Sequence, residues 1–225
     1  MKNTFVKFKN GFTLAEVLIT LVIVGVIAAL TIPTVVNNTK KQEYVTKLKK
    51  TYSSLAQATN LIISEYGNPR ADIGGWAFSS DNVFDLYKNK LIKSKECNGA
   101  SGCMQQIDAT GGVMYLNGNS YEPANFNAGS NYKKLILSDG VQIAFLKVRD
   151  DCSRMDWGVS NWCIEITVDV NGEKQPNQWG RDWYRFMVTE EGLKPAGAEA
   201  ANDCNKSGQG FTCAAKVLRE NAMNY

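Results

Sequence analysis

The N-terminal part of the chain contains an apolar run that is long enough to cross a lipid bilayer. Residues 12–36 include a single charged side chain, that of Glu16. As an α-helix the run would measure roughly 37 Å, which spans the hydrocarbon core of a bilayer with some tilt. The run is apolar on every face, whereas a helix on the surface of a globular domain has a polar side. It therefore predicts a transmembrane helix.

Glu16 is the unusual residue of this helix, because a carboxylate in a membrane span costs about 2.5–3.5 kcal/mol on insertion scales. Such a residue suggests a function, such as pairing with a positive charge, although its side chain could also reach the lipid headgroups. Two simpler interpretations of the run explain less. A cleaved secretory signal would be shorter and would end in a small-residue cleavage site, and a plain membrane anchor leaves Glu16 unexplained.

The residues around Glu16 resemble those of a known family. A short basic leader ends at Gly11, and the sequence FTLAE follows, from Phe12 to Glu16. Pro33 stands at the twenty-second position counted from Phe12. This combination, over about the first fifth of the chain, resembles the class III leader and N-terminal helix of type IV pilins and type II secretion pseudopilins.

The resemblance implies specific roles for these residues. A prepilin peptidase would cut between Gly11 and Phe12, and the new amino terminus at Phe12 would be N-methylated. Glu16 would receive the Phe12 amine of a neighbouring subunit, and pairing the two charges removes much of the cost of burying either alone. Pro33 lacks an amide hydrogen and clashes with the carbonyl of Ala29, so we expect a kink or a locally melted turn there.

Beyond the membrane run, the helix is predicted to continue to Tyr66 with one apolar stripe. The stripe consists of Val45, Leu48, Tyr52, Leu55, Thr59, Ile62 and Tyr66. Its steps of three and four residues are those of one helix face, and Thr59 is its polar exception. The Gly-Asn-Pro sequence at residues 67–69 ends the helix, because proline cannot continue it. This one-sided half must lie against another element, most simply a sheet.

The C-terminal part of the chain has the alternation of β-strands. Four strands are predicted, at residues 134–137, 141–148, 163–170 and 182–189, with a short end at 193–195. With the long helix they make an α+β fold built on an antiparallel meander of about four strands, which is also the pilin architecture. Short helices are expected near residues 81–91 and 213–221. The predicted parts are a leader at 1–11, a transmembrane and polymerisation helix at 12–36, its amphipathic continuation at 37–66 and a globular head at 67–225.

The six cysteines all lie in the head, and their even number is typical of disulfides formed in an oxidising compartment. Of fifteen possible connectivities, we predict the three sequence-local pairs, because each would pin a short loop. These are Cys97–Cys103, Cys152–Cys163 and Cys204–Cys213. The last pair resembles the disulfide-bounded loop near the carboxyl end of many type IV pilins. A zinc site is disfavoured, since the chain has neither a CxxC couple nor a histidine.

The cysteines and the lysines give opposite indications of membrane orientation. Five lysines follow the apolar run and outnumber the three of the leader, which by the positive-inside rule favours a cytoplasmic head. They are Lys40, Lys41, Lys47, Lys49 and Lys50. We give the cysteines more weight and expect a single-pass protein of the bacterial inner membrane with its head outside the cytoplasm. The resemblance places the basic stretch in the helical core of a filament.

Composition argues against an enzyme and against a nucleic-acid-binding protein. The chain has no histidine, which removes the commonest general base and metal ligand, and it has no Walker-type phosphate loop. The precursor has a net charge of +3, and without the three leader lysines the chain has equal numbers of basic and acidic residues. No global positive field is therefore available to attract nucleic acid, although a local patch could still bind it.

The segment at residues 169–182, DVNGEKQPNQWGRD, is rich in oxygen ligands of the kind that Ca²⁺ prefers. Asp169, Asn171 and Asp182 are the candidate calcium ligands, with backbone carbonyls completing the shell. Some pseudopilins bind calcium in a loop of their sheet, but the spacing is not that of an EF-hand. The simpler interpretation is a turn-rich connection that uses Asx-turns, Gly172 and Pro176.

The sequence as a whole predicts a filament subunit that polymerises through its N-terminal helix and displays an α+β head. The expected partners are copies of itself and other pilins, the prepilin peptidase, the inner-membrane assembly machinery and, before assembly, the lipid bilayer. The alternative is a minor pilin whose head binds a surface, DNA or a secretion substrate at the filament tip. The sequence fits a subunit of a type IV pilus, of a type II secretion pseudopilus or of a competence filament.

Overall fold

The computed structural model describes residues 11–97, 103–104, 112–120 and 131–225. The predicted leader therefore lies, except for Gly11, outside the described residues. By its internal contacts the chain divides into two compact units, Met1–Lys40 and Lys41–Tyr225. The second unit contains the C-terminal half of the long helix together with the sheet.

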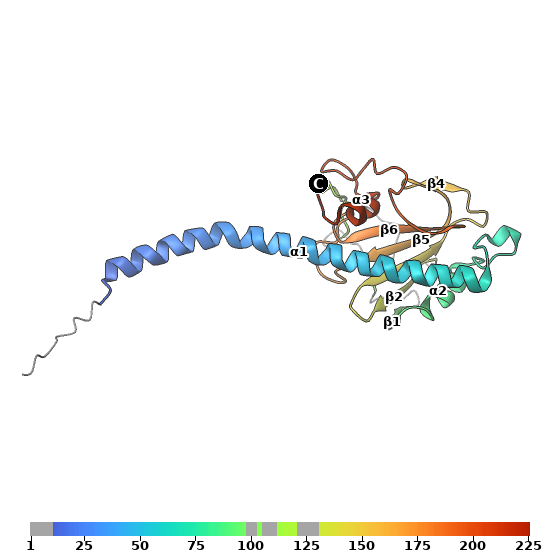
Figure 1. The fold of residues 1–225 in the computed structure, drawn as a ribbon, viewed down its shortest axis with the longest axis horizontal. Helices are drawn as coiled ribbons and strands as arrows, with labels where there is room; N and C mark the ends of the chain where they lie inside the picture. The colour runs from blue at the N-terminus through green and yellow to red at the C-terminus, as the bar shows by residue number, and fades with distance from the viewer. Residues whose placement is uncertain (1–10, 98–102, 105–111, 121–130) are drawn as a thin grey trace, which may run out of the picture. The chain divides into compact units, whose positions relative to one another are not determined.

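The predicted long helix is present as α1 (Leu14–Tyr66; Figure 1). It ends where the Gly-Asn-Pro signal predicts, because Gly67 adopts φ +80° and its N–H donates to the carbonyl of Ile63 at 2.8 Å. Most of the apolar stripe of its second half is buried, with Leu48, Leu55 and Ile62 fully inside the core, whereas Tyr52 is half-buried and Tyr66, the last residue of the helix, is exposed. The expected amphipathic continuation is thus confirmed.

The described part of the head contains one seven-stranded antiparallel sheet. In chain order the strands are β1 (Lys93–Cys97), β2 (Lys133–Leu137), β3 (Gln142–Lys147), β4 (Arg154–Asp156), β5 (Val159–Asp169), β6 (Trp183–Thr189) and β7 (Gly192–Pro195). Their spatial order is β1-β2-β3-β5-β6-β7, and β4 pairs with β5 alone. The α+β class and the meander are as predicted, but the number of strands is larger than four.

The missed strands are those whose sequences lack apolar alternation. β1 has the sequence KSKEC, with only Cys97 buried, and β4 has only three residues. Neither contains the pattern by which a half-buried strand is recognised. Both form because a neighbouring strand offers them backbone partners: β1 pairs with β2, and β4 folds back on β5.

One face of the sheet packs against the second half of α1. Apolar side chains of β3, β5 and β6 join those of α1 in a single core. Tyr52 stacks on Phe186 with ring centroids 5.6 Å apart. Thr59, the polar exception of the stripe, makes a 2.6 Å hydrogen bond with the hydroxyl of Tyr87, which lies on α2 (Ser80–Lys88). The Thr59 hydroxyl is therefore buried together with a hydrogen-bond partner, and Thr59 does not interrupt the packing of the stripe.

The other face of the sheet is covered by aromatic side chains, among them Phe211. The guanidinium of Arg185 lies 4.3 Å from the ring centroids of Trp157, Trp179 and Phe211, and its Nε is 3.1 Å from Glu165. Helix α3 (Cys213–Glu220) follows Phe211, agrees closely with the predicted C-terminal helix and buries its apolar side chains in the same core as α1. A short 3₁₀ helix, η1 (Ala71–Ile73), connects α1 to α2.

Candidate functional site

The first half of α1 exposes its apolar side chains. Phe12 is 88% exposed, and large apolar residues remain uncovered as far as Val36. Within the described part of the chain, α1 is the helix that is long and apolar enough to cross a membrane, with a mean hydropathy of 2.6 in its most apolar window. Such a surface is unstable in water, so lipid or other copies of the helix must cover it.

The predicted cleavage bond lies just before this helix. Gly11 and Phe12 are exposed and non-helical, and α1 begins two residues after Phe12. A Cβ added to Gly11 would meet no atom of the chain within 4 Å. The fold therefore has room for a side chain at this position. If glycine is required here, the requirement comes from a partner molecule such as a peptidase.

Glu16 is held at the N-terminus of α1 by a reciprocal hydrogen-bond pattern. Its Oε2 accepts from the Thr13 N–H and from the Thr13 hydroxyl, both at 2.8 Å. In return, the Glu16 N–H donates to Thr13 Oγ1 at 3.2 Å. This is a capping box, which satisfies N–H groups that a helix start leaves without partners.

The capping box is a feature that the sequence prediction missed. The signal was present as Thr-x-x-Glu, Thr13 to Glu16, directly before an apolar run. Both bonds to the carboxylate end on Oε2, and within the described residues Oε1 accepts none. One oxygen of Glu16 thus helps to start the helix, and the other is available to a further donor.

Pro33 lies inside α1, and the helix continues through it without interruption. The locally melted turn that we considered is therefore not present. Proline still removes the amide donor that would bond the carbonyl of Ala29. Two threonines of this half donate to the backbone of the preceding turn: Thr20 Oγ1 to the Val17 carbonyl and Thr31 Oγ1 to the Ile27 carbonyl, both at 2.9 Å.

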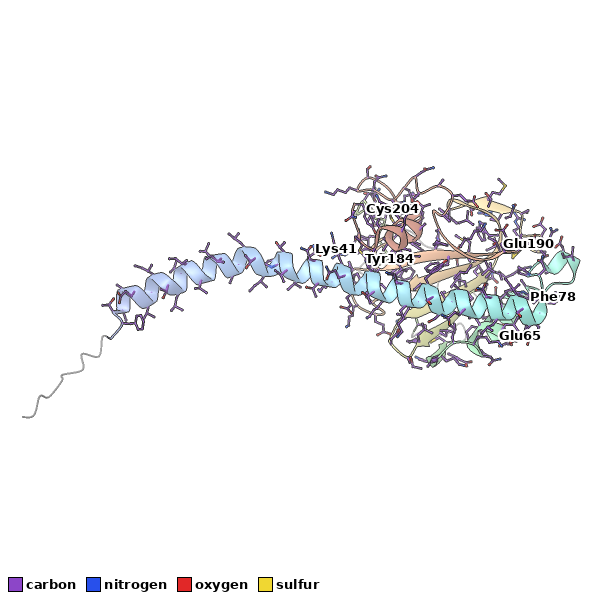
Figure 2. All side chains as sticks on the ribbon, viewed as in Figure 1. Lys41, Glu65, Phe78, Tyr184, Glu190 and Cys204 are labelled. Carbon is purple, nitrogen blue, oxygen red and sulfur yellow. A yellow bond between two sulfur atoms is a disulfide. The ribbon has the colours of Figure 1, made fainter. Side chains whose placement is uncertain are left out.

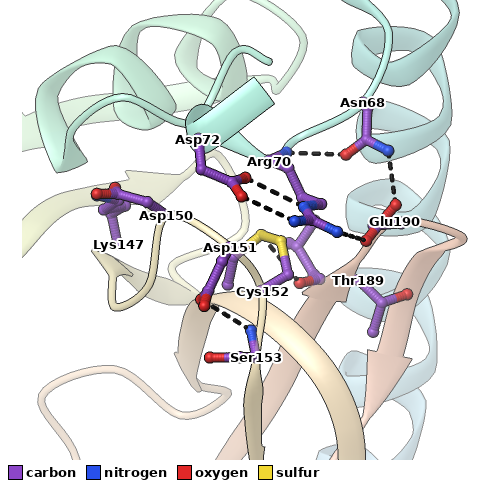
Figure 3. Close-up of a disulfide and its surroundings, with 12 residues drawn as sticks. Asn68, Arg70, Asp72, Lys147, Asp150, Asp151, Cys152, Ser153, Thr189 and Glu190 are labelled. Atoms are coloured by element: carbon purple, nitrogen blue, oxygen red, sulfur yellow. Dashed lines mark hydrogen bonds and ion pairs between the residues drawn. A yellow bond between two sulfur atoms is a disulfide. The ribbon is translucent and has the colours of Figure 1, made fainter. Parts of the chain in front are cut away.

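The cysteines of the head form three disulfides, and they are the three sequence-local pairs. Cys152–Cys163 lies beside an ion-pair cluster (Figure 3). In this cluster Arg70 Nη2 is 2.7 Å from Asp72 and Nη1 is 3.4 Å from Glu190. The hydrogen bond from Arg70 lowers the pKa of the Asp72 carboxyl. The contacts of Arg70 and Asn68 with Glu190 join the segment after α1 to the β6–β7 turn, and the disulfide beside them ties the loop before β4 to β5.

The structure brings the three candidate calcium ligands to one buried place. Asp169 Oδ1 accepts from the N–H groups of Asn171 and Gly172 at 3.1 and 3.0 Å, which is the Asx-turn of the simpler interpretation. Asp182 Oδ1 accepts from the Gln178 N–H at 2.6 Å. Asp169 and Asp182 are only 2% and 0% exposed.

The burial of the two aspartates is offset only in part. The charge of Arg181 and hydrogen bonds from Gln178 and Asn171 favour the charged form of Asp182, but burial outweighs them. Burial raises the pKa of Asp182 to about 7, and burial together with the charge of Asp182 raises the pKa of Asp169 well above its usual range. Asp182 Oδ2 and Asn171 Oδ1 have no partner of hydrogen-bonding geometry among the described residues. The same residues include no cluster of three or more His, Cys, Asp or Glu side chains suited to a metal ion.

Comparison with known proteins identifies the N-terminal segment. A family model for the prokaryotic N-terminal methylation motif matches residues 7–32, a segment that contains Gly11, Phe12 and Glu16. No curated protein and no solved structure matches the chain. The match therefore concerns the segment with the exposed apolar helix and the capping box, and it does not extend to the head.

Proposed function

We propose, from the N-terminal methylation motif that is the hallmark of type IV pilin and pseudopilin precursors, that this chain is a structural filament subunit. The observation that carries the proposal is the coincidence of that motif with a helix half that exposes its apolar side chains. A lipid bilayer would cover this surface before assembly, and the helices of other subunits would cover it afterwards. The role is structural rather than catalytic.

The proposed maturation begins at the exposed bond between Gly11 and Phe12. A prepilin peptidase hydrolyses this bond, so that Gly11 gains a carboxylate and Phe12 gains a free amine, which is then methylated. The amine is a cation at the start of an apolar helix. The accessible, non-helical backbone at Gly11 and Phe12 supports this step.

In the assembled filament, Glu16 would pair with the Phe12 amine of a neighbouring subunit. Its Oε1 accepts no hydrogen bond among the described residues, while Oε2 keeps the capping box. An unpaired carboxylate among apolar side chains costs free energy. An arrangement that places the Phe12 amine of a neighbour beside Glu16 is therefore favoured over one that leaves Glu16 unpaired. The pair would therefore set the stagger between helices. The disulfides suit a head outside the cytoplasm.

Two variants of Glu16 test the pairing, because glutamine can form a capping box but carries no charge. The chain is expressed with a prepilin peptidase and an assembly machinery, and sheared filaments are quantified. We expect cleavage but few filaments from both Glu16→Ala and Glu16→Gln. Wild-type filament yield from Glu16→Gln would show that only the cap matters and would overturn the pairing.

A variant of the leader tests the maturation itself. Gly11→Val should fold normally, because a side chain at this position meets nothing in the chain. The variant should keep its leader and should not appear in filaments. A processed Gly11→Val chain, detected by its mass, would count against peptidase cleavage at this bond.

We also propose that Asp169, Asn171 and Asp182 hold Ca²⁺. The supporting observation is that two buried carboxylates lie together while Asp182 Oδ2 and Asn171 Oδ1 have no hydrogen-bond partner among the described residues. The ion would neutralise the carboxylates, with backbone carbonyls adding oxygens. Thermal unfolding of the full chain in detergent should shift upward with Ca²⁺ but not after Asp182→Asn. No shift and no heat of binding for the wild-type chain would refute the site.

A further inference from the structure

The positive charge of the chain beyond the leader is concentrated on a short part of α1. Residues 41–50 contain four lysines and a single acid, Glu43. The lysines are Lys41, Lys47, Lys49 and Lys50, which we call the lysine segment. The globular head, residues 67–225, has 17 basic and 19 acidic residues. The chain without its leader is neutral as a whole, but the lysine segment is positive and the head carries a small net negative charge.

An acidic cleft lies at the turn between β6 and β7. It has a volume of about 270 Å³ and is lined by Glu190, Glu191 and Glu199, which we call the glutamate cleft. Lys194 is its single basic lining residue, with Nζ 3.0 Å from Glu191 and 3.9 Å from Glu199. Arg70 approaches Glu190 but forms its shorter contact with Asp72. The cleft therefore has room and charge for a further ammonium group.

The ion pairs that these groups make within the chain are easily exchanged. The side chain of Glu191 is 78% exposed, and Lys50 is 64% exposed in its pair with Asp139. Exposed pairs of this kind contribute about 0–1 kcal/mol. Their low stability means that a partner from another molecule can replace or join them at little cost.

The lysine segment and the glutamate cleft lie at opposite ends of the unit Lys41–Tyr225. Glu190 accepts a hydrogen bond from Asn68 Nδ2 at 2.7 Å, so the cleft lies where α1 ends. From Lys50, the lysine of the segment nearest to that end, to Tyr66 the helix rises roughly 24 Å. Figure 2 shows Lys41 and Glu190 at the two ends of this unit. The two surfaces cannot meet within one subunit.

We propose that the lysine segment of one subunit docks at the glutamate cleft of a second copy of this chain. Two different surfaces that pair head to tail do not close on themselves, so they generate an open, extended assembly. The argument for this occupant is charge complementarity between two surfaces of the same chain. The inference rests on the proposed filament function and adds to it a second contact, between heads, besides the pairing of Glu16.

Charge reversal in both partners tests the contact. Glu191→Lys with Glu199→Lys should lower the yield of sheared filaments about five- to tenfold, because repulsion replaces attraction. Adding Lys41→Glu and Lys49→Glu to the same chain should restore the yield. The matched control is Asp81→Lys with Asp85→Lys, two exposed acids on α2 outside the cleft, which should assemble normally. Wild-type yield from the cleft variant would overturn the inference.

Zero-length cross-linking of wild-type filaments gives a readout that does not depend on variants. A carbodiimide joins a lysine amine to a glutamate carboxylate with loss of water, which the reagent takes up. A peptide that joins the lysine segment to the glutamate cleft must come from two subunits, because the distance within one subunit is too large. Its absence from filaments that yield other cross-links would overturn the inference.

The outcomes separate this inference from the proposed function. If the wild-type chain forms no filaments, the filament function fails. If filaments form without the cross-link and with the cleft variant, the function stands and the docking is wrong. In that case, binding of the lysine segment to vesicles of phosphatidylglycerol, lost in Lys41→Glu with Lys49→Glu, would assign the lysines to anionic lipid instead.

Discussion

The two halves of α1 share one continuous helix and have opposite surroundings. Between Leu14 and Val36 the apolar side chains are exposed, whereas in the second half Leu48, Leu55 and Ile62 are fully buried. The first half is apolar on all faces, and no sheet could cover it on more than one side. The second half is apolar along one stripe, and one face of the sheet, together with α2, covers most of it.

The difference shows that the distribution of apolar residues, rather than their number, decides what covers a helix. A one-sided stripe is satisfied within its own chain. An all-round apolar surface needs several partners, which only lipid or other subunits can supply. The same reasoning applies to the polar groups of the two halves and to a charge buried in the sheet, and substitutions at each test it.

The largest difference is expected for leucine truncation. Leu55→Ala in the second half should lower the free energy of unfolding of the head by about 2–5 kcal/mol, because it removes a fully buried side chain from the core. The matched control is Leu21→Ala in the first half, where the leucine is exposed. It should change head stability by less than about 0.5 kcal/mol. Urea unfolding of the full chain in detergent gives both values. Equal losses of stability in the two variants would contradict the difference between the two halves of α1.

A smaller difference is expected for threonine hydroxyls. Thr59 Oγ1 donates to the Leu55 carbonyl at 2.7 Å, so Tyr87 is the donor in the bond between Thr59 and Tyr87. Thr59→Val should leave the buried Tyr87 hydroxyl without its partner and cost about 1–3 kcal/mol. Thr31→Val in the first half should have almost no effect on the head.

A double-mutant cycle sharpens this result. Combining Thr59→Val with Tyr87→Phe removes both hydroxyls, so no buried donor is left unsatisfied. The double variant should recover about half or more of the stability lost in Thr59→Val. Additive losses from the two substitutions would show that the hydroxyls are not coupled.

The smallest effect is expected for the removal of a buried charge, and this substitution should stabilise the head instead of destabilising it. The exposed Glu16 can gain a partner from another subunit, but Lys134 is fully buried in β2 and its Nζ has no hydrogen-bond partner among the described residues. Lys134→Met should therefore raise the free energy of unfolding near pH 7 by about 1–2 kcal/mol. Lys133→Met is the control, since Lys133 pairs with Asp81 at 2.7 Å and its loss should bring no gain.

The pH dependence of this gain follows from the direction of the pKa shift. Burial lowers the pKa of Lys134 in the folded head, so the charged form destabilises the fold wherever the unfolded chain is protonated. The gain from methionine is therefore largest near neutral pH and shrinks as the pH rises toward the ordinary lysine value of 10.5. A gain that does not change with pH would show that packing, not charge, is its cause.

Much of the fold could be predicted from the sequence because the signals are local. The end of α1 at Tyr66 follows from three consecutive residues, and β3, β5 and β6 follow from alternation along single segments. The cleavage and methylation motif is likewise one contiguous segment. The capping box of Thr13 and Glu16 was equally local and was missed only because Glu16 was interpreted by its charge alone.

Other features could not be predicted, because they depend on residues far apart in the chain. The exposed strand β1 is recognisable only from its pairing with β2, which follows it by more than thirty residues. Thr59 appears as a defect in the stripe until α2 places Tyr87 beside it. The glutamate cleft joins the β6–β7 turn to β5 and to Glu199.

The sequence by itself determined the apolar helix, its charged start at Glu16 and its end, since helix periodicity and capping act over a few residues. Only the tertiary structure decided which polar groups of the head are paired, which are buried, and which glutamates face solvent in the glutamate cleft. The physical reason is that burial and charge depend on neighbours in space. The chain supplies those neighbours for the second half of α1 and leaves the first half to lipid or to other subunits.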